Sequence, residues 1–387
     1  MTRKFAWWGL SFLFGLILFA ADWGESFLSF AIAAAASGVL LFVSVKKYRV
    51  YVLSVTVCVL LGLLFGKIYT LRFYDPIMSY DGKTVVLDGY ITDFSYSGSD
   101  VCRITVKGRI NGGSKTSVTY FAENDDFEYY QYVRVTGKVS AISDTIKFDS
   151  QSYNRPRGVF LQGDSTPEVE IKDGCRSRLM RSVMKFRDYA SQIIRDNTGE
   201  REGAFLTAML CGDKTDLDDV TKTMLYRSGI GHLFAVSGTH LAVIAMFFGF
   251  IINRLFSSKR IRFILIEAVI VVFIAFAGFS PSVMRAGIMM SAVQCSGIFR
   301  RRADTLNSLG ICSAAMCAFN PYLVRNVSFS MSLAAAFAAG VVGPALDRSL
   351  TDKRFVRLSR SFVSVTVVLF VTLPLAAVYF TEVSVVS

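Results

Sequence analysis

The chain has 387 residues, of which 52% are hydrophobic and 19% are charged, and its formal net charge is +12. Soluble globular chains average about 45–50% apolar and about 25% charged residues. The apolar excess lies in uncharged runs of about 16–20 residues, among them 5–21, 26–45, 51–66 and 361–380. A helix needs roughly 20 such residues to cross a bilayer, so the composition argues against a soluble enzyme and favours a membrane protein.

The N-terminus resembles a signal peptide, because Arg3 and Lys4 precede an apolar run. The run is long and bulky, however, and two further apolar runs follow directly. We therefore expect residues 1–66 to form a retained transmembrane anchor with about three spans.

The positive charge gathers in short segments between apolar runs, at 46–49, 259–262, 300–302 and 348–360. Such loops are held on the cytoplasmic side, so topology explains most of the charge without nucleic acid. This orientation predicts a multi-pass protein of the cell (cytoplasmic) membrane with residues 75–173 outside the cytoplasm.

Residues 75–173 have the pattern of a β domain. Segments 84–91, 101–106, 117–121 and 132–139 mix β-branched and aromatic residues with polar ones, and Gly- and Ser-rich turns separate them. A small barrel is expected, with an OB-like fold as one candidate. The expected fold class is thus a multi-pass α-helical membrane protein with an inserted small OB-like β-barrel domain outside the cytoplasm.

The remainder reads as helical. Residues 176–227 are mixed, and basic and apolar positions alternate along 176–195, so we expect amphipathic, interfacial helices in 176–227. Residues 229–387 form about six spans, near 232–255, 263–279, 283–299, 305–319, 328–346 and 361–380, giving about nine in all. The chain ends inside an apolar stretch, so we expect it to be truncated.

Polar side chains are concentrated near the start of this second apolar region, at His232, Ser237, Thr239 and His240. They can bond back to the helix at an interface, or they can line a polar pathway; we favour the pathway. A Ser237–His240 hydrolase lacks an evident acid. A metal shared by the two histidines is disfavoured, because eight helical residues span roughly 12 Å.

Arg285 starts a later span beside Ser280 and Ser282. It can snorkel to the interface, or face inward and meet an anion. We expect Arg285, the two serines and the histidine segment to converge on one pathway.

The seven cysteines form no CxxC or His-linked pattern, so neither a metal site nor a cofactor is predicted. Cys102 and Cys175 are the two expected outside the cytoplasm, where disulfides form. Whether they are bridged stays open at this point.

Several stretches resemble the ComEC competence family of bacterial DNA-uptake channels. They include FLTAMLCGDKTDL followed by LYRSGIGHLFAVSGTHLAVI, then GFSPSVMRAGIMM, and LPLAAVYFTEVSVVS at the C-terminus. The stretch RRADTLNSLGICSAAMCAFNPYLVRNVSFSMSLAAAFA and the segment with Phe148, Asp149, Tyr153 and Arg157-Gly158-Val159 are also similar to that family.

The resemblance implies a membrane channel for single-stranded DNA during competence (natural transformation), and not an enzyme. It also implies membrane lipids, DNA-receptor and DNA-motor proteins of the uptake machinery, and a second copy of the chain as partners. A multi-pass exporter of small molecules or lipids is the alternative. The family's C-terminal metallo-β-lactamase-like domain is missing.

Residues 75–173 depart from a DNA-binding pattern in their charge, with 15 acidic and 11 basic residues. A phosphate-binding face there would need local positive charge. Aromatic residues can stack bases, and the candidates are Tyr90, Phe94, Tyr96, Tyr120, Phe121, Tyr129, Tyr130 and Tyr132.

Overall fold

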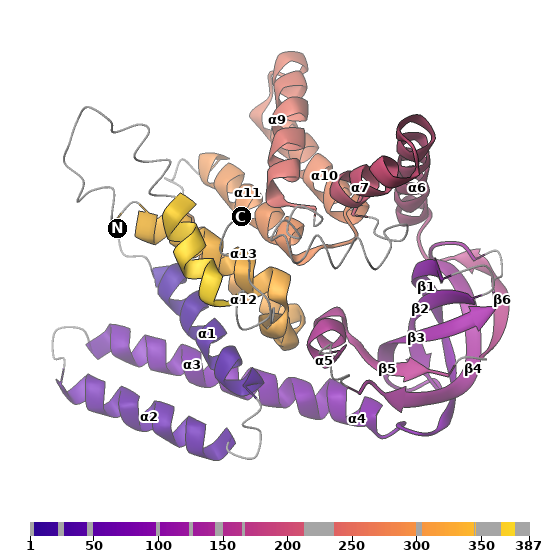
Figure 1. The fold of residues 1–387 in the computed structure, drawn as a ribbon. Helices are drawn as coiled ribbons and strands as arrows, with labels where there is room; N and C mark the ends of the chain where they lie inside the picture. The colour runs from indigo at the N-terminus through magenta and orange to yellow at the C-terminus, as the bar shows by residue number, and fades with distance from the viewer. Residues whose placement is uncertain are drawn as a thin grey trace. The chain divides into compact units, whose positions relative to one another are not determined.

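The computed structural model contains two compact units (Figure 1). Unit 1 comprises residues 1–64, 218–319 and 324–387, and unit 2 comprises residues 65–217 and 320–323. The residues that the structure describes are 4–21, 27–44, 49–97, 101–123, 127–143, 150–164, 167–212, 236–298, 304–343, 345 and 365–375.

The N-terminal apolar runs form three helices, as expected: α1 (Lys4–Ala20), α2 (Phe27–Ser44) and α3 (Arg49–Tyr69). A π-helical turn (Thr70–Tyr74) continues α3 into α4 (Asp75–Met78), so Arg49–Met78 is one helix of 30 residues. Pro76, which has no backbone N–H to donate, lies directly after the π-helical turn, where the hydrogen-bond pattern of the helix changes.

Helix α1 packs backbone-to-backbone against two other helices of unit 1. A Cβ atom added at Gly9 would lie 2.1 Å from the carbonyl oxygen of Gly310 on α12, and one at Gly15 would lie 2.2 Å from that of Val59 on α3. The backbone N–H of Ala6 also donates to Asn307 Oδ1 at 3.0 Å. Missing side chains therefore let three helix backbones meet, as small residues do between membrane helices.

The second apolar region forms α9 (Gly238–Leu255), α10 (Lys259–Phe276), α11 (Pro281–Ile298), α12 (Thr305–Phe319) and α13 (Val327–Phe337). A π-helical segment (Ala338–Val342) extends α13, and a further helix spans Val365–Leu375. Helices α9, α10 and α11 share one buried cluster, made of Val236, Leu241, Ile270, Phe273, Ala277 and Val283.

Unit 2 is built on a six-stranded sheet: β1 (Thr84–Ser97), β2 (Val101–Ile110), β3 (Lys115–Glu123), β4 (Gln131–Ala141), β5 (Val159–Gly163) and β6 (Glu168–Cys175). The strand order is β1-β2-β3-β5-β4-β6, with a further pairing of β1 with β4. The β3–β5 pair is parallel and the other pairs are antiparallel. The four strand segments predicted from sequence are confirmed as parts of β1 to β4.

Alternation along β2 and β3 separates two faces of the sheet. The side chains that face the core are at most 4% exposed, and they are Cys102, Ile104, Val106, Val118, Tyr120 and Ala122. The intervening side chains face the other side, and the register pairs Arg103 with Phe121, Thr105 with Thr119 and Lys107 with Ser117.

The core of unit 2 includes a residue from far along the chain. Tyr322, in the 3₁₀ turn Pro321–Arg325, is 6% exposed and belongs to the same buried cluster as the strands. Its hydroxyl lies 3.0 Å from Thr70 Oγ1, and its ring packs edge-on against that of Phe160. Asn320 holds this turn against the segment before β5, because its side-chain amide donates to the carbonyl oxygens of Arg155 and Pro156, each at 2.9 Å.

Helices before β5 and after β6 complete unit 2. Helix α5 (Ser150–Asn154) and the 3₁₀ turn Arg155–Arg157 precede β5, and α6 (Arg178–Thr198) and α7 (Glu200–Leu210) follow β6. Ser177 caps α6 by accepting the backbone N–H of Met180 at 3.3 Å. Exposed apolar side chains follow one face of α6: Leu179, Phe186, Tyr189 and Ile193.

The predicted fold class is wrong. Two described helices, Arg49–Met78 and Gly238–Leu255, are long and apolar enough to cross a membrane. Four other apolar helices are shorter: Lys4–Ala20, Thr305–Phe319, Val327–Val342 and Val365–Leu375. The sequence prediction made the spans too long because an apolar run can include the turn that follows a helix. The β region is a mixed six-stranded sheet with one parallel pair, in place of the expected OB-like barrel. Alternation predicted its strands but not their long-range pairing.

The close contact of α1 with α12 predicts that Gly310→Ala destabilises the protein. The new Cβ would lie 2.6 Å from Phe5 O and 2.8 Å from Ala6 Cα, both backbone atoms that cannot rotate away. Overpacking of this kind costs about 1–3 kcal/mol. Thermal unfolding of the purified protein should show a lower midpoint.

Gly297→Ala is the matched control, because a Cβ there meets nothing within 4 Å and the residue lies in helix α11. Alanine is the better helix former, so this change should be neutral or slightly stabilising. Equal midpoints for the two variants would contradict the packing argument.

Candidate functional site

Ser237 and His240 meet at the start of α9. Ser237 is the residue before the helix, and its backbone N–H donates to His240 Nδ1 at 3.1 Å. The Ser237 hydroxyl also lies 3.0 Å from the same nitrogen. Because the backbone N–H can only donate, Nδ1 must accept, and the ring proton then lies on Nε2. The pair forms a capping box in which histidine takes the place of the usual Glu or Gln.

The Ser237–His240 distance also has the length that a serine nucleophile and its base require. The capping box explains this contact without catalysis, since Nδ1 is shared with the backbone of the same turn. The expectation that the chain is not an enzyme stays a prediction.

Arg285, on α11, is half-buried and bonds to neutral groups. Its Nε donates to Ser332 Oγ on α13 at 2.7 Å, and one terminal nitrogen lies 3.5 Å from the sulfur of Met289. Ser282 Oγ is 3.4 Å from the same Ser332 hydroxyl. Within the described ranges no carboxylate forms an ion pair with Arg285. Its guanidinium group is therefore held by one hydroxyl and one sulfur, and its remaining N–H donors have no partner among the described residues.

Two polar residues of this helical region were missed by sequence reasoning. Ser332 joins Arg285 to Ser282, and Glu267 on α10 accepts a 2.6 Å hydrogen bond from Ser291 on α11. The other oxygen of Glu267 is buried and has no hydrogen-bond partner. A lone acid within the apolar run 263–276 was a readable signal for Glu267. A serine in an alanine-rich helix gave no comparable signal for Ser332.

The structure brings only part of the predicted pathway together. Gly238 on α9 packs against Ala286, the neighbour of Arg285, since a Cβ at Gly238 would lie 2.7 Å from Ala286 Cβ. Thr239 is exposed, and Ser280 lies just before α11. His232 lies outside the described residues. Convergence on one pathway stays a prediction, and no three potential metal-ligating side chains gather among the described residues.

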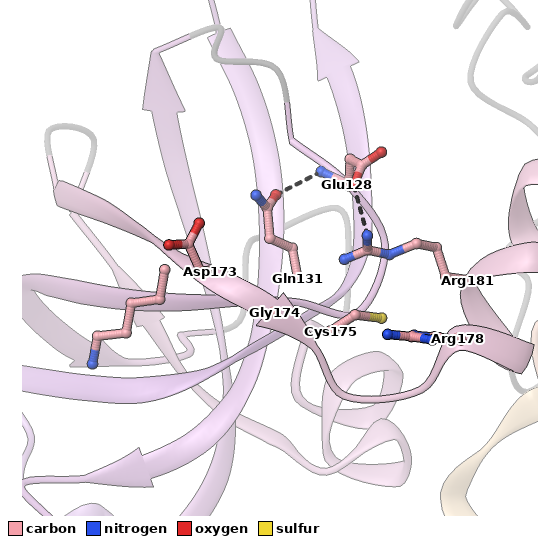
Figure 2. A pocket seen from close by; sticks show the side chains of 8 residues that line it. Glu128, Gln131, Asp173, Gly174, Cys175, Arg178 and Arg181 are labelled. Carbon is pink, nitrogen blue, oxygen red and sulfur yellow. Dashed lines mark hydrogen bonds and ion pairs between the residues drawn. The ribbon is translucent and has the colours of Figure 1, made fainter.

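Unit 2 contains a separate charged hollow of about 350 Å³ between β6 and the start of α6 (Figure 2). Lys172, Arg178 and Arg181 line it together with Glu128 and Asp173. Figure 2 shows the Glu128 carboxylate directed toward Arg181. Glu128 Oε2 lies 2.9 Å from a terminal nitrogen of Arg181. The hollow therefore already holds carboxylates that neutralise most of its positive charge.

Glu128 also ties α6 to the turn before β4. Lys185 Nζ lies 2.5 Å from Glu128 Oε1, and Arg181 Nε donates to the carbonyl oxygen of Tyr129 at 3.1 Å. The hydrogen bond from Lys185 lowers the pKa of the Glu128 carboxyl, and the charge of Arg181 adds to this while partial burial opposes it. The ion pairs thus contribute to the docking of α6 only while Glu128 is charged.

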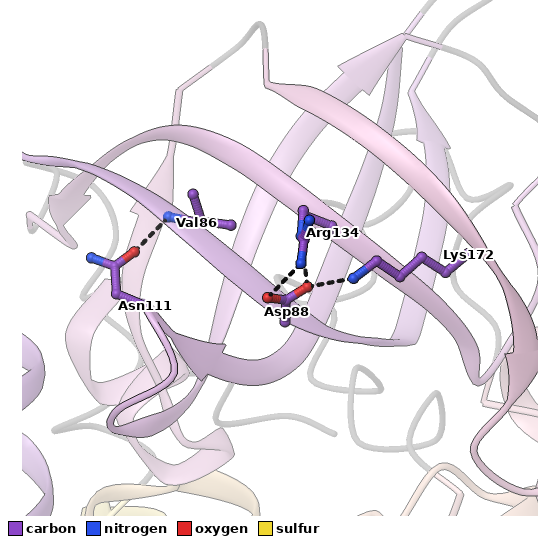
Figure 3. Close-up of polar contacts among 5 residues, drawn as sticks. All are labelled: Val86, Asp88, Asn111, Arg134 and Lys172. Carbon is purple, nitrogen blue, oxygen red and sulfur yellow. Dashed lines mark hydrogen bonds and ion pairs between the residues drawn. The ribbon is translucent and has the colours of Figure 1, made fainter.

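A second ionic cluster braces the sheet itself (Figure 3). Asp88 on β1 lies 2.9 Å from Arg134 Nε on β4 and 2.7 Å from Lys172 Nζ on β6. Hydrogen bonds from Arg134 and Lys172 lower the pKa of Asp88. Beside it, Asn111 Oδ1 accepts the backbone N–H of Val86 at 2.9 Å. Lys172 is therefore engaged with Asp88 as well as lining the hollow.

Cys102 and Cys175 are free thiols, so the structure does not support the disulfide hypothesis. Cys102 is 0% exposed in the core beneath β2, whereas Cys175 lines the charged hollow at the end of β6. The sequence predicted that both cysteines lie in the same compartment. It could not predict that Cys102 points into the core while Cys175 lies at the hollow.

The Glu128 ion pairs predict a pH-dependent stability difference. The pKa of Glu128 is lowered by folding, so its contribution is present above the unfolded value of about 4.3 and is lost as pH falls through the folded value. Glu128→Gln should cost about 0.3–1 kcal/mol at pH 7, because the pairs are partly exposed, and nothing near pH 3.

Thermal unfolding at both pH values tests this prediction. Glu168→Gln, which removes an exposed carboxylate on β6, is the control and should have little effect at either pH. A deficit for Glu128→Gln that persists at pH 3 would mean that the side chain acts through packing instead.

The two thiols should differ in reactivity. Burial raises the pKa of Cys102 to about 11, so little thiolate is present at pH 8, and the side chain is inaccessible. Maleimide labelling of the folded protein with peptide mapping should modify Cys175 well before Cys102. Labelling of Cys102 should require denaturant, and a mapped peptide linking the two cysteines would contradict the structure.

Comparison with known proteins connects this geometry to a family. A family model described as "Competence protein" matches residues 209–387, which include α9 to α13. The ComE operon protein 3 of Bacillus subtilis (strain 168) is 24% identical over 196 residues, covering 50% of this chain and 24% of that protein. The chain thus spans about a quarter of that relative's length, and no solved structure matches it. The resemblance read from the sequence is confirmed for this part of the chain, because residues 209–387 match the family model described as "Competence protein".

Proposed function

We propose that the chain takes part in DNA uptake during competence and conducts single-stranded DNA across the cytoplasmic membrane. The observation that carries the proposal is the setting of Arg285. It lies on α11, within the family-matched residues 209–387, and its guanidinium is held by Ser332 without a carboxylate among the described residues.

The chemistry of this arginine fits a phosphate cargo. A charged side chain costs about 2.5–3.5 kcal/mol at the centre of a membrane helix on insertion scales and less near its ends. Arg285 lies near the start of α11, and a polar or anionic partner offsets the remaining cost of facing inward. The guanidinium offers five donors in a planar fork that matches two phosphate oxygens. Ser332 takes one donor through Nε and orients the fork, and one terminal nitrogen contacts only the weakly accepting Met289 sulfur, so the terminal nitrogens can still turn their donors to an anion. The proposal assigns no catalytic step to the chain.

Membrane association is supported by the helices Arg49–Met78 and Gly238–Leu255, which have the length and hydropathy of a span. The exposed apolar face of α6 would lie against membrane lipids at the interface. We place residues 75–173 outside the cytoplasm, because the basic segments at 46–49 and 259–262 favour the cytoplasmic side.

The proposal also includes partners. Incoming single-stranded DNA requires a receptor that delivers it and a motor that drives it, and a second copy of this chain can complete the conducting path. Support for this machinery comes from the match to the competence family and from a relative named as a ComE operon protein.

The proposal predicts that Arg285→Ala lowers DNA uptake by about 10- to 100-fold, as expected for the loss of charge-assisted hydrogen bonds. Arg285→Lys should restore uptake only in part, because an ammonium group lacks the planar fork. Transformation frequency and entry of labelled DNA would be measured in competent cells carrying each variant at the chromosomal locus.

Arg254→Ala provides the matched control, since Arg254 lies in the last turn of α9 and is exposed. Immunoblots of membrane fractions should show equal amounts of all variants. Normal uptake by Arg285→Ala at a normal protein level would overturn the assignment of Arg285 to the conducting path.

A further inference from the structure

A second hollow in unit 2 lies on the face of the sheet opposite the core. Its volume is about 180 Å³, well below the roughly 300–1,000 Å³ of pockets for drug-sized ligands. A hollow of this size suits one planar ring system. The side chains that give it chemical character are Arg103, Thr119, Phe121, Tyr153, Asn154 and Gln162.

Strand register builds one wall of this hollow. Arg103 on β2 lies opposite Phe121 on β3, and Thr119 on β3 is paired with Gln162 on β5. Each of these side chains alternates with core residues, so all four project from the outer face. The two faces of the same strands thus carry different tasks, one packing the core and the other lining the hollow.

Helix α5 supplies the other wall. Tyr153 is 39% exposed, and it lies within the hollow's lining together with Asn154. The guanidinium carbon of Arg157 lies 3.8 Å from the centre of the Tyr153 ring, which is a close cation–π contact. The tyrosine ring is therefore held by Arg157 while part of its surface stays open to solvent.

The lining combines the groups that recognise a nucleobase. Phe121 and Tyr153 offer aromatic surfaces for stacking, and the side-chain amides of Asn154 and Gln162 can donate to and accept from a base edge. Among the eight aromatic residues that the sequence suggested for stacking, Phe121 lines this hollow, whereas Tyr120 is 0% exposed in the core. Tyr153 was not among them.

Local charge favours a nucleic acid here despite the acidic balance of residues 75–173. Among the residues that the structure describes, the hollow's lining includes Arg103 and no carboxylate, and Arg157 stands beside it on Tyr153. Neither arginine forms an ion pair with a described residue. The charged hollow of Figure 2 differs, because Glu128 and Asp173 already occupy its lining.

We propose that the outer hollow between β2, β3, β5 and α5 binds a base of single-stranded DNA, with the base stacked on Tyr153 and Phe121 and a neighbouring phosphate on Arg103. The inference rests on the proposed function and deepens it, because it gives unit 2 a contact with the DNA that is separate from Arg285. Stacking is tolerant of sequence, as a DNA-uptake protein requires.

The test measures binding of a fluorescein-labelled oligothymidylate to the full-length chain in detergent micelles by fluorescence anisotropy. Tyr153→Leu keeps an apolar side chain but removes the ring, and it should raise the Kd about tenfold. Tyr153→Phe keeps the ring and should bind within about twofold of the wild type. Tyr189→Leu is the matched control: it removes a tyrosine that is 61% exposed on α6, outside the hollow, and should leave the Kd unchanged.

Two further measurements separate stacking from charge. An abasic oligonucleotide of equal length carries the phosphates without bases, so Tyr153→Leu and the wild type should bind it equally. Arg103→Gln should weaken binding of both oligonucleotides and reduce the slope of log Kd against log salt concentration by about 1.

Equal Kd values for Tyr153→Leu and Tyr189→Leu would overturn the proposal, as would a failure of Tyr153→Phe to restore binding. A wild-type chain that binds no oligothymidylate would overturn it as well. None of these outcomes decides the proposed function, because the uptake assay with Arg285→Ala tests that function through unit 1.

Discussion

Direct contact between helix backbones organises unit 1. Gly9 and Gly310 let α1 and α12 approach so closely that a single methyl group on either would overlap the other's backbone. Asn307 adds a hydrogen bond from the same helix to the backbone of Ala6. Helix α12 also packs against α11 and α13, the two helices joined by Arg285 and Ser332. The N-terminal helix is therefore part of the framework that holds the arginine.

In unit 2 the same strands both enclose a core and form the wall of a surface hollow. Alternation on β2 and β3 does this with adjacent residues: Ile104 is buried while Arg103 lines the outer hollow. Net charge is a poor guide to such a surface. Some acidic residues of this region, such as Asp88 and Glu128, form ion pairs within the fold. The local charge that a ligand meets therefore differs from the net charge of the region.

Sequence reasoning predicted local structure well and long-range structure poorly. Alternating β-branched residues predicted β1 to β4, and apolar runs predicted α9 to α13, because both signals arise within one element. The prediction of the fold class was wrong because hydropathy along the sequence reports composition and does not show where a helix ends. Ser332 was not predicted as a partner of Arg285, and Tyr153 was not predicted as a stacking residue. Ser332 meets Arg285 from another helix, and Tyr153 lines its hollow together with residues of strands, so both arrangements arise only in the tertiary fold. No local pattern predicted that the turn at Asn320 introduces Tyr322 into the core of unit 2.

That insertion has a consequence for how the protein is made. Tyr322 bonds to Thr70, 252 positions earlier in the chain, and packs among the rings of Tyr69, Tyr74 and Phe160. A ribosome releases the strands of unit 2 long before it reaches this tyrosine, although domains usually fold as their own residues emerge. Until Tyr322 has been synthesised, the core of the nascent sheet therefore lacks one of its aromatic side chains. Completion of unit 2 is tied to translation of the helices that precede residue 320, and a ribosome that stalls among them would leave the sheet unfinished.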